Sequence, residues 1–301
     1  MIMNKLMYSF IDIIKYMKIP LIVGLLLSIV AAMIGVVLVL KRYSMIGDGL
    51  SHVGFGAVAI GLACGIQPLY IAIPFVIVSA YVLLRLGESK KVNGDAAIAL
   101  ISSSALAIGF LAGNLSDGFS SDINSYMFGS ITTATVNDLY YVLPIALIII
   151  VLLVLFFNRI FAITFDESFA KASGINTRFY SIFLSVATAL IIVIGIKIMG
   201  TLLISSLIIF PALTSMKLFR TFKKVIISSI VVSCTSFLIA FFLFTKFSSA
   251  ASIVIVNLAF YLVALAIHQI MKKIKKWGSF LILTFHNFIN IGFFIFASNF
   301  D

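Results

Sequence analysis

The chain has 301 residues, of which 62% are hydrophobic and 10% are charged, and its mean hydropathy is +1.24. Soluble domains carry roughly 25% charged residues, so a protein that faces water on all sides is excluded. The sequence predicts an all-α polytopic membrane protein whose apolar surface contacts membrane lipid. The net charge of +11 fits basic cytoplasmic loops better than a nucleic-acid interface, and we expect no nucleic-acid partner.

An amphipathic lead-in and nine apolar runs organise the chain. Residues 1–18 mix charged and apolar side chains, so we expect an N-terminal segment that lies at the membrane interface. Residues 19–271 form one predicted transmembrane domain of eight or nine helices, and residues 272–301 hold a basic cluster and an apolar tail whose role stays open. The nine apolar runs cover residues 19–40, 50–66, 68–86, 94–112, 139–157, 179–197, 199–217, 224–245 and 250–270.

The charged loops give the direction of each span. The segment from Gly113 to Asp138 contains Asp117, Asp122 and Asp138 but no lysine or arginine, which places it outside the membrane. It either attracts cations to an outer mouth or is an ordinary solvated loop. The N-terminus then lies outside as well. The basic clusters assigned to the cytoplasm are Lys41–Arg42, Arg85–Lys91, Arg159–Arg178, Lys217–Lys224 and Lys272–Lys276.

An acid and an imidazole stand at the edge of the second run, in the stretch SMIGDGLSHVGFG. If this stretch is helical, Asp48 and His52 differ by about 40° around the helix axis and share one face. An ionisable residue inside a membrane span is costly and indicates function by default. Carboxylate and imidazole are ligands for first-row divalent ions, so we predict a metal site on a translocation path. The alternative is an Asp–His hydrogen bond that only braces helix packing.

Two ligands hold an ion weakly, which suits a transport site that must bind and then release its cargo. Structural zinc sites use four ligands, and two copies of the chain that meet at a symmetry axis would supply two Asp48 and two His52 side chains. Two carboxylates would also offset the charge of a divalent cation in a low-dielectric path. Both residue types accept zinc, manganese and iron(II), so they leave the metal open.

The cytoplasmic segment FDESFAKASGINTRFYS, residues 165–181, has the pattern of a short amphipathic helix. Asp166 is placed to cap its N-terminus, and Gly174 is placed to end it. Such a helix is a surface that a docked partner could hold, although a plain connecting loop explains the pattern equally well. The sequence has no G-x-x-x-x-G-K-[ST] phosphate-binding loop, so ATP-driven transport would need a separate nucleotide-binding chain.

Three other residues are weaker candidates. Pro211 should kink or break the seventh run, and it marks either a hinge or a packing kink. Lys197 lies at the outer end of the sixth run, where we expect it to anchor the helix at the interface. His268 lies beside the basic cluster near a cytoplasmic helix end, and we expect it to snorkel rather than to bind metal.

Several stretches together resemble the permease subunits of ABC importers for divalent metals, the family of zinc, manganese and iron(II) uptake permeases. They occur in the family's order over residues 20–270, and DINSYMFGSI is nearest to the zinc branch. The stretches that carry the resemblance are RYSMIGDGLSHVGFGAVAIG (42–61), GDAAIALISSSALAIG (94–109), YMFGSI (126–131), FDESFAKASGI (165–175) and MGTLLISSLIIFPALTS (199–215).

The resemblance implies a homodimeric, multi-pass permease of the bacterial plasma membrane without a permanently bound cofactor. Its partners would be a cytoplasmic ABC ATPase subunit and an extracytoplasmic metal-binding protein. Asp48 and His52 match the family's metal position. The stretch 165–175 matches its ATPase-docking coupling helix, which here includes Asp166, Glu167, Phe169, Ala170 and Gly174.

We therefore predict a transport subunit, not an enzyme, that imports zinc by alternating access while a partner chain hydrolyses ATP. Within this architecture the alternatives are manganese or iron(II) import, or import of a metal chelate such as a siderophore or cobalamin. A metal carrier driven by an ion gradient and an intramembrane enzyme are alternatives from other classes. Only Asp48 and His52 approach a catalytic constellation, which argues against the enzyme.

Overall fold

The structure is a computed structural model that describes residues 17–88, 94–114, 126–127, 129, 131, 134–243 and 250–273. Within these residues the regular secondary structure is helical, which confirms the predicted all-α fold. The same residues contain eight helices long and apolar enough to cross a membrane, and a shorter apolar stretch, Pro68–Leu84, within α4. The helices are α2 (Lys18–Leu40), α3 (Ile46–Ala63), α4 (Pro68–Glu88), α5 (Gly94–Asn114), α7 (Val136–Leu155), α8 (Phe157–Phe165), α9 (Glu167–Ala172), α10 (Thr177–Met199), α11 (Thr201–Leu218) and α12 (Phe222–Leu243), followed by Ala250–Lys273.

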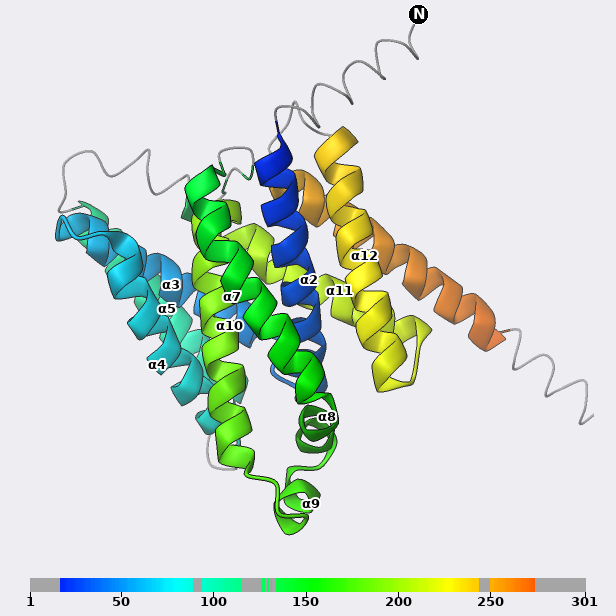
Figure 1. The fold of residues 1–301 in the computed structure, drawn as a ribbon. Helices are drawn as coiled ribbons and strands as arrows, with labels where there is room; N and C mark the ends of the chain where they lie inside the picture. Colours follow the sequence, from blue (N-terminus) through cyan, green and yellow to red (C-terminus); the bar gives the residue numbers. More distant parts are fainter. Residues whose placement is uncertain are drawn as a thin grey trace, which may run out of the picture.

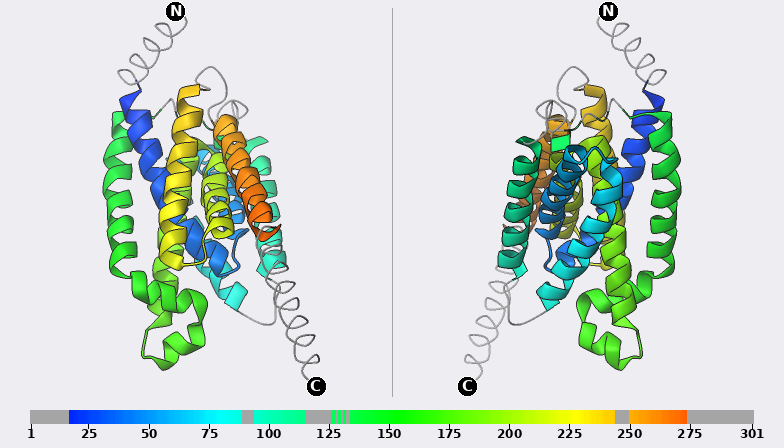
Figure 2. Two further views of the ribbon diagram at one scale, coloured as in Figure 1. Left: turned by 90° about the vertical axis from the view of Figure 1, so that its right-hand side faces the viewer. Right: turned by 90° about the vertical axis from the view of Figure 1, so that its left-hand side faces the viewer.

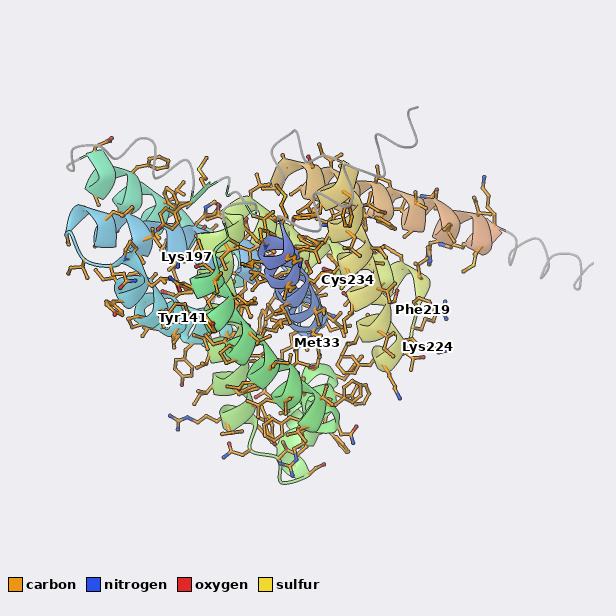
Figure 3. All side chains as sticks on the ribbon, turned by 45° about the horizontal axis from the view of Figure 1, so that its top comes forward. Met33, Tyr141, Lys197, Phe219, Lys224 and Cys234 are labelled. Carbon is orange, nitrogen blue, oxygen red and sulfur yellow. The ribbon has the colours of Figure 1, made fainter. Side chains whose placement is uncertain are left out.

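Four helices form the centre of the bundle (Figure 1). In their most apolar stretches α2, α3 and α10 are 72% buried and α11 is 61% buried, whereas α5 is 22% buried and α7 is 28% buried. α3 packs against α4, α5, α10 and α11, and α2 packs against α7, α11 and α12. Side chains such as Met33 of α2 fill the interior (Figure 3). The outer helices therefore leave much of their surface to lipid or to another chain.

The helix ends alternate between two sides of the molecule, as the loop charges predict (Figure 2). α2 begins on one side and Ala250–Lys273 ends on the other, while α8 and α9 lie at the end where α7 finishes. For the helix ends to alternate in this way α4 must cross as well, which agrees with the nine apolar runs of the sequence. The predicted interfacial segment 1–18 and tail 272–301 lie almost wholly outside the described residues, and both stay predictions.

Two helix boundaries differ from the expectation. α3 begins at Ile46 rather than at residue 50, so Asp48 and His52 both lie inside a helix. The carboxylate of Asp48 shortens the apolar run but is favourable in the first turn of a helix, where the backbone dipoles are positive. Residues 158–165, which follow the fifth apolar run and were expected to lie in a cytoplasmic loop, belong to the separate amphipathic helix α8.

α11 runs unbroken through Pro211, so the expected break is absent. Proline removes one backbone hydrogen bond, but Pro211 is buried and α11 is held closely against α2. A Cβ on Gly35 of α2 would collide with the carbonyl oxygen of Ile208. Packing of neighbouring helices keeps a proline-containing membrane helix intact. A hinge at Pro211 stays a prediction.

Two glycines set the distance between α3 and α5. A Cβ on Gly56 would collide with the carbonyl oxygen of Ala105, and a Cβ on Gly109 would lie 2.8 Å from the Gly56 Cα. Small residues at a crossing let the backbones of two membrane helices approach closely. This crossing therefore fixes α5 beside the helix that carries Asp48 and His52.

Replacing Gly56 with alanine should lower the thermal unfolding temperature of the purified protein, because the added methyl group meets backbone atoms. We expect a cost of about 1–3 kcal/mol from overpacking, which exceeds the roughly 1 kcal/mol that alanine gains over glycine within a helix. Gly47→Ala is the matched control, since its Cβ would lie 3.3 Å from a side-chain methyl group of Ile208 and would meet no backbone atom of another helix that closely. Equal unfolding temperatures for the two variants would contradict the close crossing.

Candidate functional site

α3 is buried on almost every side. The face that is not buried contains the two predicted metal ligands. From Ile46 to Ala59, only Asp48 and His52 are not buried. Their side chains are 46% and 33% exposed, respectively. Both residues lie one turn apart on one face of the helix. The sequence therefore places its acid and its imidazole at the single opening in this part of α3.

Asp48 and His52 are not hydrogen-bonded to each other. His52 Nε2 lies 3.7 Å from Asp48 Oδ2, which is beyond the roughly 3.2 Å reach of an N–H···O hydrogen bond. Zinc lies about 2.0–2.2 Å from its nitrogen and carboxylate ligands, so two tetrahedral ligands of one ion stand about 3.4 Å apart. The observed separation is close to that of two atoms sharing an ion, and the bracing hydrogen bond is absent.

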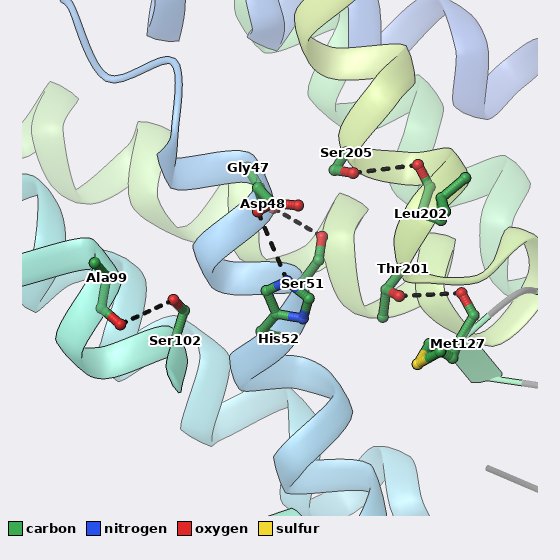
Figure 4. Close-up of polar contacts among 10 residues, drawn as sticks. All are labelled: Gly47, Asp48, Ser51, His52, Ala99, Ser102, Met127, Thr201, Leu202 and Ser205. Atoms are coloured by element: carbon green, nitrogen blue, oxygen red, sulfur yellow. Dashed lines mark hydrogen bonds and ion pairs between the residues drawn. The ribbon is translucent and has the colours of Figure 1, made fainter. Parts of the chain in front are cut away.

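Hydroxyl side chains flank the pair on two sides (Figure 4). Ser102 of α5 lies on one side and Ser205 of α11 on the other. Each hydroxyl donates to a carbonyl oxygen of its own helix, at 3.2 Å in both cases. Among the residues that the structure describes, no third His, Cys, Asp or Glu joins Asp48 and His52. One chain therefore offers a metal ion two strong ligands.

The predicted cytoplasmic helix is present as α9, with both of its predicted end signals. Asp166 is the N-cap, and its carboxylate accepts from the backbone N–H of Phe169 at 2.9 Å. Gly174 has a positive φ of 78°, and beyond it the N–H of Ile175 donates to the carbonyl oxygen of Ala170 at 3.0 Å. This is the hydrogen bond of a Schellman ending, which glycine favours because it adopts positive φ without strain.

α9 projects from the end of the bundle that the loop charges place in the cytoplasm, and it packs against α8 and α10. Ala170 is fully buried, so its side chain seats the helix against the rest of the chain. Phe169 on the same helix is 64% exposed, and Phe165 just before it is 58% exposed. Glu167 and Lys171 form an ion pair of 2.8 Å along the helix. The outward surface of α9 is therefore apolar at its centre and charged beside it.

An ion pair that the sequence analysis missed joins α7 to α10. Lys197 Nζ donates to Asp138 Oδ1 at 2.7 Å, and the Asp138 side chain is 11% exposed. The sequence places Asp138 in an outer loop, but it belongs to the first turn of α7 and forms a capping box with Thr135. The Thr-x-x-Asp pattern ahead of an apolar run is the local signal for that box. Lys197 was expected to anchor its helix at the membrane interface. It also forms an ion pair with a residue on another helix.

The remaining candidates are placed away from the Asp48–His52 pair. His268 Nδ1 lies 2.9 Å from the carbonyl oxygen of Lys217, near the C-terminal end of α11. A histidine N–H at that position satisfies one of the free carbonyls at a helix end. Asp117 and Asp122 of the predicted outer mouth lie outside the described residues.

Comparison with known proteins decides the family. The ABC 3 transport family matches residues 13–268, which is most of the chain. The chain belongs to the ABC 3 transport family. Together with its apolar helices, this membership makes it a multi-pass transport subunit of the bacterial plasma membrane and not an enzyme.

Relatives of this ABC 3 family protein align along nearly their whole length. The high-affinity zinc uptake system membrane protein ZnuB of Buchnera aphidicola subsp. Schizaphis graminum is 31% identical over 80% of this chain and 94% of the relative. The manganese import system permease protein ScaB of Streptococcus gordonii is 25% identical over 87% of this chain and 94% of the relative. Among solved structures, PsaBC from Streptococcus pneumoniae in complex with Fab matches with a TM-score of 0.76 and 27% identity, covering 86% of this chain and 95% of that chain. This match confirms the predicted permease architecture.

Lys197→Met should destabilise this ABC 3 family protein, because it leaves the Asp138 carboxylate without its cation. We expect a loss of roughly 1–3 kcal/mol, the cost of an unsatisfied buried polar group, measured by thermal unfolding in detergent. Lys197→Arg is the control that keeps the charge, and the double variant Lys197→Met/Asp138→Asn should recover part of the loss. If Lys197→Met unfolds at the wild-type temperature, the ion pair contributes nothing to stability.

Proposed function

We propose that this protein is the membrane permease of an ATP-driven importer of divalent metal ions. Zinc is the expected cargo, and manganese and iron(II) are the alternatives. The observation that carries the proposal is the open Asp48–His52 pair on an otherwise buried helix. Relatives named for zinc uptake and for manganese import support a divalent metal as the substrate. The ligand atoms accept either ion, so the preference for zinc rests on the relatives and not on the site chemistry.

A second copy of the chain would complete the metal site. A half-exposed carboxylate that faces acyl chains is costly, so the open face of α3 needs a polar cover. Beside it, α5 is only 22% buried and exposes small residues such as Ala99 and Ser103, which suit close packing against another helix. Two copies would bring together two Asp48 and two His52 side chains, enough for a four-ligand zinc site.

α9 is the proposed docking surface for a cytoplasmic ABC ATPase, which would supply the nucleotide-binding site. An extracytoplasmic metal-binding protein would deliver the ion at the other side of the membrane. Capping of α9 at both ends keeps a six-residue helix formed, and the exposed Phe169 side chain offers an apolar anchor for a partner. Asp166, Glu167 and Gly174 shape this surface, while Ala170 holds it to the rest of the chain.

Asp48→Asn and His52→Gln should each abolish metal import by the reconstituted permease–ATPase complex, because each removes one of two strong ligands per chain. The loss should exceed the roughly 10–100-fold that follows removal of a hydrogen-bond partner of a metal ligand. The measurement is uptake of radioactive zinc into proteoliposomes, together with metal-stimulated ATP hydrolysis. Ser102→Ala, on the flank of the same opening, is the control and should retain transport.

Two outcomes of this experiment would overturn the proposal. Full transport by both variants would indicate a metal-chelate substrate, which needs a wide chamber and no ligand pair. Zinc uptake by the permease alone, without the ATPase and driven by a proton or sodium gradient, would indicate a self-sufficient carrier.

Phe169→Ala should weaken the association of the permease with its ATPase while leaving the permease folded. Truncating an exposed aromatic anchor at the centre of an interface costs roughly 2 kcal/mol or more, which raises Kd by more than tenfold. Binding is measured with both purified components in detergent. Phe219→Ala is the matched control, since Phe219 is 40% exposed and follows α11 rather than lying on α9 (Figure 3). Equal Kd values for the two variants would place the docking surface elsewhere.

A further inference from the structure

A pocket separate from the Asp48–His52 pair lies on the flank of the bundle, where α4 and α7 both pack against α10. Its volume is about 250 Å³, close to the roughly 300 Å³ lower end of small-molecule pockets. Most of its wall is aliphatic, and its polar groups are the Asp138–Lys197 ion pair, one glutamine and two tyrosines. The lining includes Gln67, Tyr70, Asp138, Tyr141, Ile145 and Lys197.

Lys197 and the two tyrosines give this pocket hydrogen-bond donors beside the Asp138 carboxylate, which only accepts. The Asp138 carboxylate already accepts from the Thr135 N–H at 2.9 Å, from the Thr135 hydroxyl at 2.8 Å and from Lys197 at 2.7 Å. An ammonium group has three N–H donors, so the bond to Asp138 leaves two on Lys197. Tyr70 and Tyr141 lie on the same lining, and each carries a hydroxyl group that can donate a further hydrogen bond. A ligand group rich in acceptors and negatively charged, such as a phosphate, fits this set.

The pocket lies at the level of the outer membrane interface. Gln67 directly precedes α4, Asp138 is in the first turn of α7 and Lys197 is in the last turn of α10, so all three mark helix ends on the outer side. Tyr70 and Tyr141 are 71% and 64% exposed, and exposed tyrosines are typical of the headgroup region of a bilayer. Figure 3 shows Lys197 and Tyr141 on the same flank of the molecule.

Below this level, the two helices that border the pocket expose apolar side chains to the surroundings. Phe75 and Val78 of α4 are 49% and 62% exposed, and Ile148 and Val151 of α7 are 57% and 52% exposed. An interface with a water-soluble protein has a polar rim. Here the exposed apolar side chains of α4 and α7 instead continue toward the middle of the bilayer. An acyl chain is the occupant that matches a groove polar at its outer end and apolar along its length.

We propose that this pocket binds a membrane phospholipid. The phosphate accepts hydrogen bonds from Lys197 and from the tyrosine hydroxyls, and an acyl chain follows the groove between α4 and α7. The lipid then bridges two helices that both pack on α10. This inference is independent of the metal proposed for the Asp48–His52 pair, because it uses a different face of the bundle and different residues.

The test compares two tryptophan variants on α7. Ile145 lines the pocket, whereas Leu147, two residues further along, points to the opposite side of α7 and is 47% exposed. Ile145→Trp should fill the groove and reduce the phospholipid that stays bound to the detergent-purified protein, as measured by native mass spectrometry. Leu147→Trp should retain as much phospholipid as the wild type. The double variant Lys197→Gln/Asp138→Asn removes both charges together and should weaken phosphatidylglycerol binding by roughly tenfold, the loss of one charge-assisted hydrogen bond.

Thermal unfolding of the delipidated protein separates the possible ligands. Phosphatidylglycerol in mixed micelles should raise the unfolding temperature of the wild type and of Leu147→Trp but not that of Ile145→Trp, and inorganic phosphate alone should have no effect. Equal lipid retention by Ile145→Trp and Leu147→Trp would overturn the proposal. So would a phosphate effect equal to that of the lipid. Weakened binding of the extracytoplasmic metal-binding protein by Ile145→Trp, with lipid retention unchanged, would instead make the pocket a protein-docking surface.

Discussion

A carboxylate within a membrane must be paired, hydrated or bound to a cation, because its free energy in a low-dielectric medium is otherwise very unfavourable. This constraint governs α3. Neighbouring helices bury every residue from Ile46 to Ala59 except Asp48 and His52, and the backbone of α5 lies directly over Gly56. Asp48 and His52 therefore occupy the one face of this part of α3 that the neighbouring described helices leave open. What covers that face must be polar, and a hydrated path or a second copy of the chain meets the requirement.

Two acid–base pairs in the same bundle differ in how far their carboxylates are already engaged. Asp138 accepts from Lys197 at 2.7 Å and from two donors of Thr135, so both oxygens of its carboxylate are engaged. Asp48 comes no closer than 3.7 Å to His52, and its side chain is 46% exposed. A carboxylate whose two oxygens are both engaged has little left for a cation, whereas an open one is free to bind a cation. The first pair fastens two helices, and the second has the open geometry that the proposed cargo ion would need.

Features that depend on chain neighbours could be predicted from the sequence, and features that depend on distant packing could not. The caps of α9 act on adjacent backbone groups, and the spacing of Asp48 and His52 alone puts them on one face. Lys197 and Asp138 are 59 residues apart, and no local rule brings them together. Pro211 is the opposite case, because local propensity favours a break while packing against α2 keeps α11 continuous.

The contacts of α10 connect the proposed docking helix to the proposed metal site. α10 packs against α9 at the cytoplasmic end and against α3 within the bundle, and a close-packed interior transmits displacement because it compresses little. At its outer end α10 passes directly into α11 through Gly200, whose φ is 83°. α11 carries Ser205, which flanks Asp48 and His52. The proposed docking helix and the wall of the proposed site that carries Ser205 are thus joined through two consecutive helices that meet at a single residue.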